Sequence, residues 1–229
     1  MMKINPNNMK LSETTVNLLK NFSSINQSIL FKEGNKLRSI SVMKNILAEA
    51  TVEESFPKDF GIYDLNQFLN CLSLIEDAEV NLEEHAIVIT NGTDSIEYRY
   101  SDPSVIVAPP ERELTLPSED VCVVLTEEQV QTVKKAAAVL QIPDVSLVGN
   151  GQQIFLTVRD KKNSGSNSYS IEVGETISTF QFNLKVENLK LLAGDYDVII
   201  SQKNLAKFTS HSRPITYFIA LEPDSTFAG

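Results

Sequence analysis

The chain contains the same folding pattern twice, and this duplication restricts its possible folds more than any other feature. Residues 11–20 read LSETTVNLLK and residues 125–134 read LTEEQVQTVK, so Leu, Ser or Thr, Glu, Val, an aliphatic residue and Lys recur 114 positions apart. Each copy continues with a predicted strand, a glycine turn and a second strand. Because a repeat of this length is a whole domain rather than a 20–50-residue solenoid unit, two similar domains are predicted. Duplicated domains favour a symmetric or ring-like assembly, which is more typical of a scaffold than of a catalyst.

Each copy is predicted to begin with an amphipathic helix. Ser12 has the position of an N-cap in the first copy, and Thr126 with Gln129 forms a capping-box pattern in the second. Apolar residues recur with helical spacing. They are Val16, Leu19, Phe22 and Ile25 in the first helix and Val130, Val133, Ala136 and Leu140 in the second. A shorter second helix is predicted over residues 63–72 and 185–192, with Gly194 ending the latter.

The rest of each copy has the pattern of antiparallel strands. The predicted fold class is therefore α+β: two similar domains, each with two helices on antiparallel sheets. The strongest strand signal is a hairpin in residues 86–100, where Asn91-Gly92 suits a tight type I′ turn. Between the copies runs a proline-rich stretch typical of a crossover between domains. Its prolines are Pro103, Pro109, Pro110 and Pro117.

The composition excludes several classes of protein. Thirty acidic and twenty basic residues give a net charge of −10, the wrong sign for binding nucleic acid by phosphate neutralisation. Cys71 and Cys122 lack CxxC spacing and predict neither a disulfide framework nor a zinc site; Cys71 lies in an apolar run and is predicted to lie in the core. Residues 1–8 lack the apolar region of a signal peptide, and no stretch approaches the roughly 20 apolar residues that span a bilayer. A cytoplasmic protein is expected.

The sequence contains no recognisable catalytic, metal or cofactor motif. His85 and His211 lie far apart near polar turns and are predicted to be surface residues. Neither a dinucleotide-binding glycine motif nor a P-loop is present. No metal site, no cofactor and no enzymatic activity are predicted.

The first helices carry lysines and amides opposite their apolar stripes. Residues 10–26, 64–75, 126–141 and 185–192 together hold six lysines and five acidic residues, so the negative charge lies elsewhere. A helix face that is merely solvated is the alternative explanation. The positions are Lys10, Asn17, Lys20 and Asn21 in the first copy and Gln131, Lys134 and Lys135 in the second.

Five strings in the chain carry a resemblance to a known family. They are residues 9–12 (MKLS), 18–26 (LLKNFSSIN), 63–69 (YDLNQFL), 72–74 (LSL) and 217–226 (YFIALEPDST). In their order and spacing they resemble the DNA sliding clamp, or DNA polymerase processivity factor, of large tailed bacteriophages. The family pattern begins at Met9, which implies an N-terminal extension or an alternative start at 1–8, a first clamp domain at 9–108, a crossover at 109–120 and a second clamp domain at 121–229.

The resemblance implies a closed, pseudo-sixfold ring of three subunits. Twelve helices would line its hole, with strands outside, and the ring would be held on double-stranded DNA by topology. Weak, sequence-independent phosphate contacts would then suffice. The DNA-facing residues implied by this arrangement are Lys10, Asn17, Lys20, Asn21, Gln131, Lys134, Lys135, Lys185 and Lys190.

The resemblance also implies partners in an infected bacterial cell. These are the replicative DNA polymerase, an ATP-driven clamp loader, and late-transcription factors with RNA polymerase. Partner tails are implied to dock in a hydrophobic pocket near the crossover. Its candidate residues are Val105, Ile106, Val107, Pro109, Leu221 and Pro223.

Ordinary structural packing is the alternative for these apolar residues. For the whole chain, two other classes stay open: a duplicated interaction scaffold without a DNA role, and a hydrolase whose site forms only in space.

Overall fold

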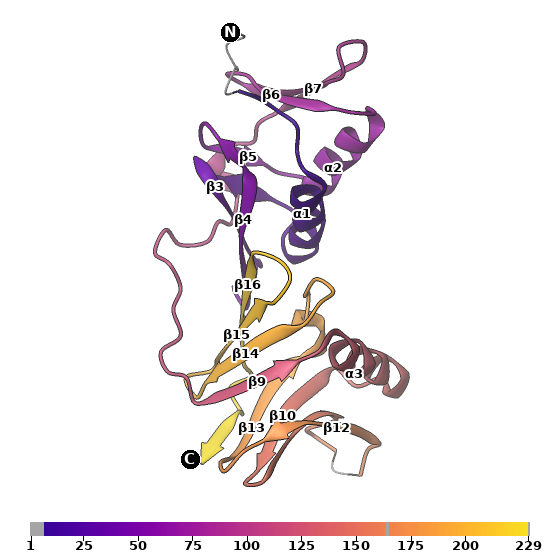
Figure 1. Cartoon of the computed structure of the whole chain (residues 1–229), viewed down its shortest axis with the longest axis vertical. Coiled ribbons are helices and arrows are strands. Elements are labelled where there is room, and N and C mark those ends of the chain that lie inside the picture. Colours follow the sequence, from indigo (N-terminus) through magenta and orange to yellow (C-terminus); the bar gives the residue numbers. More distant parts are fainter. Residues whose placement is uncertain (1–6, 164, 229) are drawn as a thin grey trace. The chain divides into compact units, whose positions relative to one another are not determined.

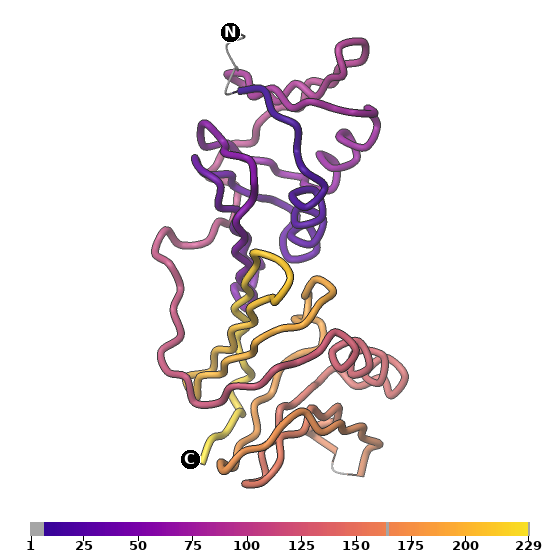
Figure 2. Tube along the Cα trace, in the orientation of Figure 1, coloured from indigo at the N-terminus to yellow at the C-terminus, as the bar shows by residue number. Residues whose placement is uncertain are grey.

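The computed structural model describes residues 7–163 and 165–228, which belong to two compact units, Met1–Glu111 and Arg112–Gly229. The division lies within the predicted crossover, residues 109–120. Figure 2 shows this connection as an extended trace without helix or strand. Residues 1–6 of the predicted extension lie outside the described part of the chain. Asn7 and Asn8 lie within it, and the backbone C=O of Asn7 accepts a hydrogen bond from Leu82 N–H at 2.8 Å.

Unit 1 combines two helices with three groups of antiparallel strands (Figure 1). Its sheet of four strands has the order β1-β6-β7-β8, while β2 pairs with β5 and β3 pairs with β4. The elements are β1 (Asn8–Met9), α1 (Glu13–Ile25), β2 (Ile29–Phe31), β3 (Gly34–Ile40), β4 (Ile46–Phe56), β5 (Phe60–Ile62), α2 (Leu65–Leu74), β6 (Glu79–Leu82), β7 (Ala86–Thr90), β8 (Ser95–Arg99) and the 3-10 turn η1 (Pro103–Val105).

Unit 2 has one α-helix and two antiparallel groups of strands (Figure 1). One sheet has the order β12-β11-β10-β13-β17, and the strands β16-β15-β14-β9 are neighbours in the other. The elements are β9 (Val121–Leu125), α3 (Glu127–Leu140), β10 (Asp144–Asn150), β11 (Gln153–Arg159), β12 (Ser168–Glu175), β13 (Thr179–Lys185), the 3-10 turn η2 (Val186–Asn188), β14 (Tyr196–Ser201), β15 (Leu205–Ser210), β16 (Ile215–Ala220) and β17 (Thr226–Ala228). The predicted α+β class is confirmed.

The predicted N-caps of the first helices are confirmed. Ser12 Oγ accepts from Thr15 N–H at 3.2 Å at the start of α1. At the start of α3, Thr126 Oγ1 accepts from Gln129 N–H at 3.2 Å, and the Gln129 side chain accepts from Thr126 N–H at 2.9 Å. These bonds satisfy amides that the first helical turn leaves without partners. The second helix of unit 1 is also present, but α2 begins and ends two residues later than predicted, after the N-cap Asp64.

The buried faces of α1 and α3 differ from the predicted stripes at three positions. Val16, Ala136 and Leu140 are only partly buried. The residues that are buried still lie three or four positions apart, so each helix has one apolar face on its sheets. They are Thr15, Leu18, Leu19, Phe22 and Ile25 in α1 and Val130, Val133 and Ala137 in α3.

The predicted second helix of the second copy, residues 185–192, is wrong. Lys185 ends β13, and only the 3-10 turn Val186–Asn188 follows, without a side-chain N-cap. The backbone beyond it is held by side chains: Leu192 N–H donates to Tyr217 Oη at 3.2 Å, and Leu192 C=O accepts from Tyr196 Oη at 2.7 Å. These bonds replace the intrahelical ones, so Gly194 does not follow a helix, although it has φ +146°.

The predicted hairpin of residues 86–100 is present, but its turn is not type I′. Thr90 pairs with Ser95, which leaves four residues in the loop. Asn91 Oδ1 accepts from the amides of Thr93 and Asp94 at 3.1 and 2.9 Å, an arrangement in which the Asn side chain itself closes the turn. Cys71, predicted to lie in the core, is only half-buried.

Thr126→Ala should destabilise unit 2 because it removes the hydroxyl of the capping box. We expect the free energy of unfolding to fall by about 1 kcal/mol, measured by urea denaturation followed by circular dichroism. Thr132→Ala, in the middle of the same helix, is the matched control and should change stability by about 0.5 kcal/mol or less. An equal loss in both variants would contradict the role assigned to the cap.

Candidate nucleic-acid interface and partner site

The predicted DNA-facing residues of α1 lie on its solvent side. Asn17 and Lys20 are exposed and Asn21 is half-buried, at the spacing that places them on one helix face. Lys10 precedes the helix, and its Nζ lies 2.9 Å from Asp77 Oδ1. The hydrogen bond to Asp77 raises the pKa of Lys10. A neighbouring carboxylate therefore offsets the charge of Lys10, while Lys20 extends from the polar face of α1.

The corresponding lysines of α3 differ in their surroundings. Lys135 is exposed and Gln131, one turn earlier, is half-buried. Lys134 is half-buried, and its Nζ donates to Leu189 C=O at 3.0 Å. Burial lowers the pKa of Lys134. The Lys134 ammonium therefore fastens α3 to the segment after η2, in addition to any role towards DNA.

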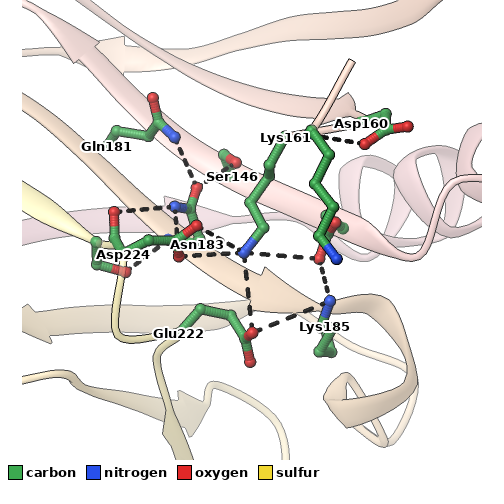
Figure 3. Close-up of polar contacts among 11 residues, drawn as sticks. Ser146, Asp160, Lys161, Gln181, Asn183, Lys185, Glu222 and Asp224 are labelled. Carbon is green, nitrogen blue, oxygen red and sulfur yellow. Dashed lines mark hydrogen bonds and ion pairs between the residues drawn. The ribbon is translucent and has the colours of Figure 1, made fainter. Parts of the chain in front are cut away.

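Lys185 lies in a cluster of charges at the end of β13 (Figure 3). Its Nζ is 2.6 Å from Oδ1 of the buried Asp144, and this hydrogen bond raises the pKa of Lys185. Lys161 joins the same cluster: its Nζ lies 2.9 Å from Asp224 Oδ2 and 3.8 Å from Glu222 Oε2. Lys185 is thus paired within unit 2. Lys190, which follows η2, is half-buried.

Asn183 connects this cluster to the segment that follows β16 (Figure 3). Its side chain is fully buried and accepts from Ser146 Oγ at 2.7 Å, while its Nδ2 donates to Asp224 Oδ1 at 3.1 Å. Its backbone carbonyl accepts from Glu222 N–H at 2.8 Å, and its N–H donates to Ser225 Oγ at 3.0 Å. Residues 222–225 are therefore attached to β13 by both backbone and side chains. Sequence reasoning missed this cluster because its members are distant in the chain and share no motif.

The predicted partner-pocket residues of unit 1 have different environments. Ile106 is a packing residue: its Cδ1 lies 2.5 Å from the place that a Cβ would take at Gly61. Val107 C=O accepts from Asn26 Nδ2 at 3.2 Å, whereas Val105 is 56% exposed. Pro109 lines a hollow of about 270 Å³ together with Leu30, Lys32, Arg38, Ala108 and Glu111.

The two predicted pocket residues of unit 2 also differ from each other. Leu221 is buried and Pro223 is exposed. A single pocket formed by both groups of residues stays a prediction.

The histidines lie on the surface, as predicted. His85 is exposed, and His211 Nε2 lies 2.9 Å from Asp197 Oδ1. In residues 7–163 and 165–228, no three His, Cys, Asp or Glu side chains gather as metal ligands. None of the helices in this part of the chain is long and apolar enough to cross a membrane.

The start of α1 is contacted by a half-buried carboxylate that the sequence did not indicate. Glu54 on β4 accepts from Thr15 Oγ1 at 2.5 Å and from Ser12 N–H. Burial opposes the ionisation of Glu54, but these hydrogen bonds together outweigh it and hold its pKa below the usual range. The carboxylate thus ties the N-terminus of α1 to β4, where a negative charge is favourable.

Lys161→Met should destabilise unit 2, because it removes the cation beside Asp224 and Glu222. We expect a loss of about 0.5–1.5 kcal/mol in the free energy of unfolding at pH 7, because the Asp224 carboxylate is 54% exposed and solvent screens the contact. The hydrogen bond from Lys161 holds the pKa of Asp224 below its usual range. This contribution is therefore complete above the ordinary Asp pKa of about 4 and is lost as the pH falls through the lowered value.

Urea denaturation of the two proteins across this pH range tests the prediction, with Lys162→Met at the exposed neighbouring position as the control. The stability difference between the native chain and Lys161→Met should shrink in acid. A difference that stays constant through the titration would contradict the assigned contact.

Comparison with known proteins finds a sliding-clamp family match in each of the two units. The family described as "DNA polymerase processivity factor" matches residues 10–108, and "gp45 sliding clamp, C terminal" matches residues 123–223. The sliding clamp of Vibrio phage KVP40 is 32% identical over 222 residues, which cover 93% of this chain and 99% of the relative.

Two solved structures show the same fold at low sequence identity. The Archaeoglobus fulgidus PCNA bound to the C-terminal region of FEN-1 has a TM-score of 0.67 at 15% identity, with 96% of this chain and 98% of that chain covered. The Helicobacter pylori beta clamp bound to a DNA ligase peptide has a TM-score of 0.71 at 14% identity and covers 97% of this chain and 67% of that chain. From its sequence and from the fold of its two units, the chain belongs to the family of phage sliding clamps, the DNA polymerase processivity factors.

Proposed function

We propose that three copies of this chain close into a ring that encircles double-stranded DNA and tethers the replicative polymerase. The observation that carries the proposal is the family match, which extends over nearly the whole chain and nearly the whole relative. The matching polar faces of α1 and α3 support it, because an acidic chain places lysines and amides on both helices at equivalent positions.

A ring explains how a chain of net charge −10 can work on DNA. Confinement by topology replaces tight binding, so a few weak contacts to phosphates are enough and the ring can slide. Such contacts carry no sequence information, which suits a processivity factor. Lys20 and Lys135 are the best placed to supply them. Lys10, Lys134 and Lys185 already have partners within the chain.

The helix content changes one detail of the expected ring. The described residues of each chain contain three α-helices rather than four, so a trimer would have nine, with the 3-10 turn η2 at the three remaining positions. The bore would therefore be chemically uneven: helix faces at most positions would alternate with the end of β13 and the segment that follows it, where Lys185 and Lys190 lie.

Two sheet edges are suited to ring closure. Among the described residues, β8 has one strand neighbour, β7, and β12 has one, β11. A head-to-tail ring requires two different surfaces that pair with each other, and an unpaired antiparallel edge on each unit meets this requirement. We propose that β8 of one copy pairs with β12 of the next.

The partners follow from the same proposal. Partner tails would dock near Val105, Val107 and Pro109 and near Leu221 and Pro223. Two clamps of the same fold hold peptides of DNA ligase and FEN-1, which supports a peptide-docking role here. A separate ATP-driven loader would place the ring on DNA, and late-transcription factors with RNA polymerase would be further partners. The chain itself would be non-catalytic, without cofactor, in the cytoplasm of an infected bacterium.

Topology gives the sharpest test of the ring. Clamps loaded by their loader onto closed circular DNA should remain bound during gel filtration and should be released when a restriction enzyme linearises the circle. Blocking both ends of the linear DNA with bound protein should restore retention. Equal retention on open linear and circular DNA would favour the alternative, an interaction scaffold without a DNA-encircling role.

The assignment of the bore can be tested by charge reversal. Lys20→Glu with Lys135→Glu should lower the amount of clamp that the loader places on circular DNA at least tenfold at low salt, because repulsion replaces attraction to phosphates. Lys44→Glu with Lys203→Glu, at exposed positions in strand-connecting turns, is the matched control and should behave as the native chain. If the two double variants lose loading equally, or neither does, the assigned face of α1 and α3 is wrong.

A further inference from the structure

The C-terminal strand β17 is a short strand at the edge of its sheet. It contains three residues, and its only strand neighbour among the described residues is β13, with the pairs Thr179–Ala228, Phe180–Phe227 and Gln181–Thr226. Thr226 and Ala228 are exposed. Such a short edge strand contributes few contacts beyond those of Phe227.

The segment directly before β17 makes several polar contacts, and Figure 3 shows those of Glu222 and Asp224. Leu221 N–H donates to Asn204 C=O at 3.0 Å, and Asn183 binds Glu222, Asp224 and Ser225 as described above. Lys161 adds its ion pairs to Glu222 and Asp224. The firm attachment therefore ends at Ser225, so β17 can leave the sheet while residues 221–225 stay in place.

β17 covers an aromatic surface of β13. The Phe227 ring stacks on the buried rings of Phe180 and Phe182, with centroids 6.4 and 6.1 Å apart. The Phe180 ring also lies across Gly149 of the neighbouring strand β10, where an added Cβ would be 2.4 Å from the ring. Removal of β17 would expose both rings and the backbone groups of residues 179–181. This edge therefore requires an occupant.

A hollow of about 500 Å³ borders β17 at the same edge. It is lined by the ends of β10 and β13 and by β17 itself, including Asn150, Thr179 and Phe227. An occupant with bulkier side chains than Thr226 and Ala228 could fill this space and gain contacts that β17 does not make.

We propose that the β13 edge is a docking edge for an extended peptide of a partner protein, and that β17 is the chain's own occupant, which the partner's peptide replaces. The peptide would carry an aromatic side chain in the place of Phe227 and uncharged residues beside it, as β17 does. Strand addition of this kind gains affinity from backbone hydrogen bonds and specificity from alternate side chains. The inference rests on the proposed function in so far as the partner is one that docks on a clamp.

Because β17 is tethered to the chain, it competes with a free peptide at a millimolar effective concentration. Removal of β17 should therefore increase the affinity of the edge for the peptide, which can be measured. The probe is a synthetic peptide of residues 225–229 with 4-fluorophenylalanine in place of Phe227, observed by fluorine NMR. A chain that ends at Ser225 should bind it at least tenfold more tightly than the full chain does. The same peptide with Ser in place of the aromatic residue, labelled at its terminus, is the control and should not bind.

A reversible lock keeps the test decisive if the shortened chain does not fold. Gln181→Cys with Thr226→Cys, opposite each other in register, would join β17 to β13 when oxidised, in a background with the exposed Cys122→Ser. The reduced lock should bind the peptide and the oxidised lock should not. Thr226→Cys alone is the control, and its peptide binding should be the same under oxidising and reducing conditions. Equal binding by both states, or no binding by both the shortened chain and the reduced lock, would overturn the proposal.

The same lock separates this inference from the proposed function. Stimulation of the replicative polymerase should be lost on oxidation and return on reduction. A clamp that stimulates equally in both states contradicts displacement by a partner and leaves the clamp function intact. A reduced clamp that binds the peptide but never stimulates the polymerase contradicts the proposed function and leaves the docking edge intact.

Discussion

The burial of one face of α1 and of α3 against strands is the constraint on which the rest of the structure depends. In both helices residues spaced by three or four positions are withdrawn from water, among them Leu18, Phe22 and Val133. The opposite faces must then remain polar. Because both copies of the duplicated pattern obey the same rule, each chain presents two equivalent polar helix faces. A ring of such chains can line a hole with them.

Charge is distributed in a way that fits confinement rather than tight binding. Several lysines that could have formed a strong phosphate-binding surface are paired within the chain, such as Lys10 with Asp77 and Lys185 with Asp144. In the proposed ring, these pairs would lower the net attraction to DNA, while the lysines still contribute to the fold. Lys134 also has a partner within the chain, since its ammonium group donates a hydrogen bond to Leu189 C=O. The polar cluster around Asn183 acts only within unit 2, where its hydrogen bonds hold residues 222–225 just before β17.

Local signals in the sequence were sufficient for the starts of the helices and for the fold class. The caps Ser12 and Thr126 depend on neighbours within a few residues, so a pattern can identify them. The sequence pattern wrongly predicted a second helix in the second copy, because the backbone at Leu192 is held by Tyr196 and Tyr217 from distant strands. The cluster of Asp144, Lys161 and Glu222 was missed for the same reason: its members come together only through the sheet. The family resemblance identified the candidate face, whereas the partners of individual lysines required coordinates.

We propose that a closed ring presents α1 and α3 to a central hole. Electron cryo-microscopy of the assembled particle tests it most directly. We expect three copies around an opening wide enough for a DNA duplex, with Lys20 and Lys135 facing that opening and the sheets outside. A particle without an opening, or one whose opening is lined by strands with these lysines on the outer surface, would contradict it.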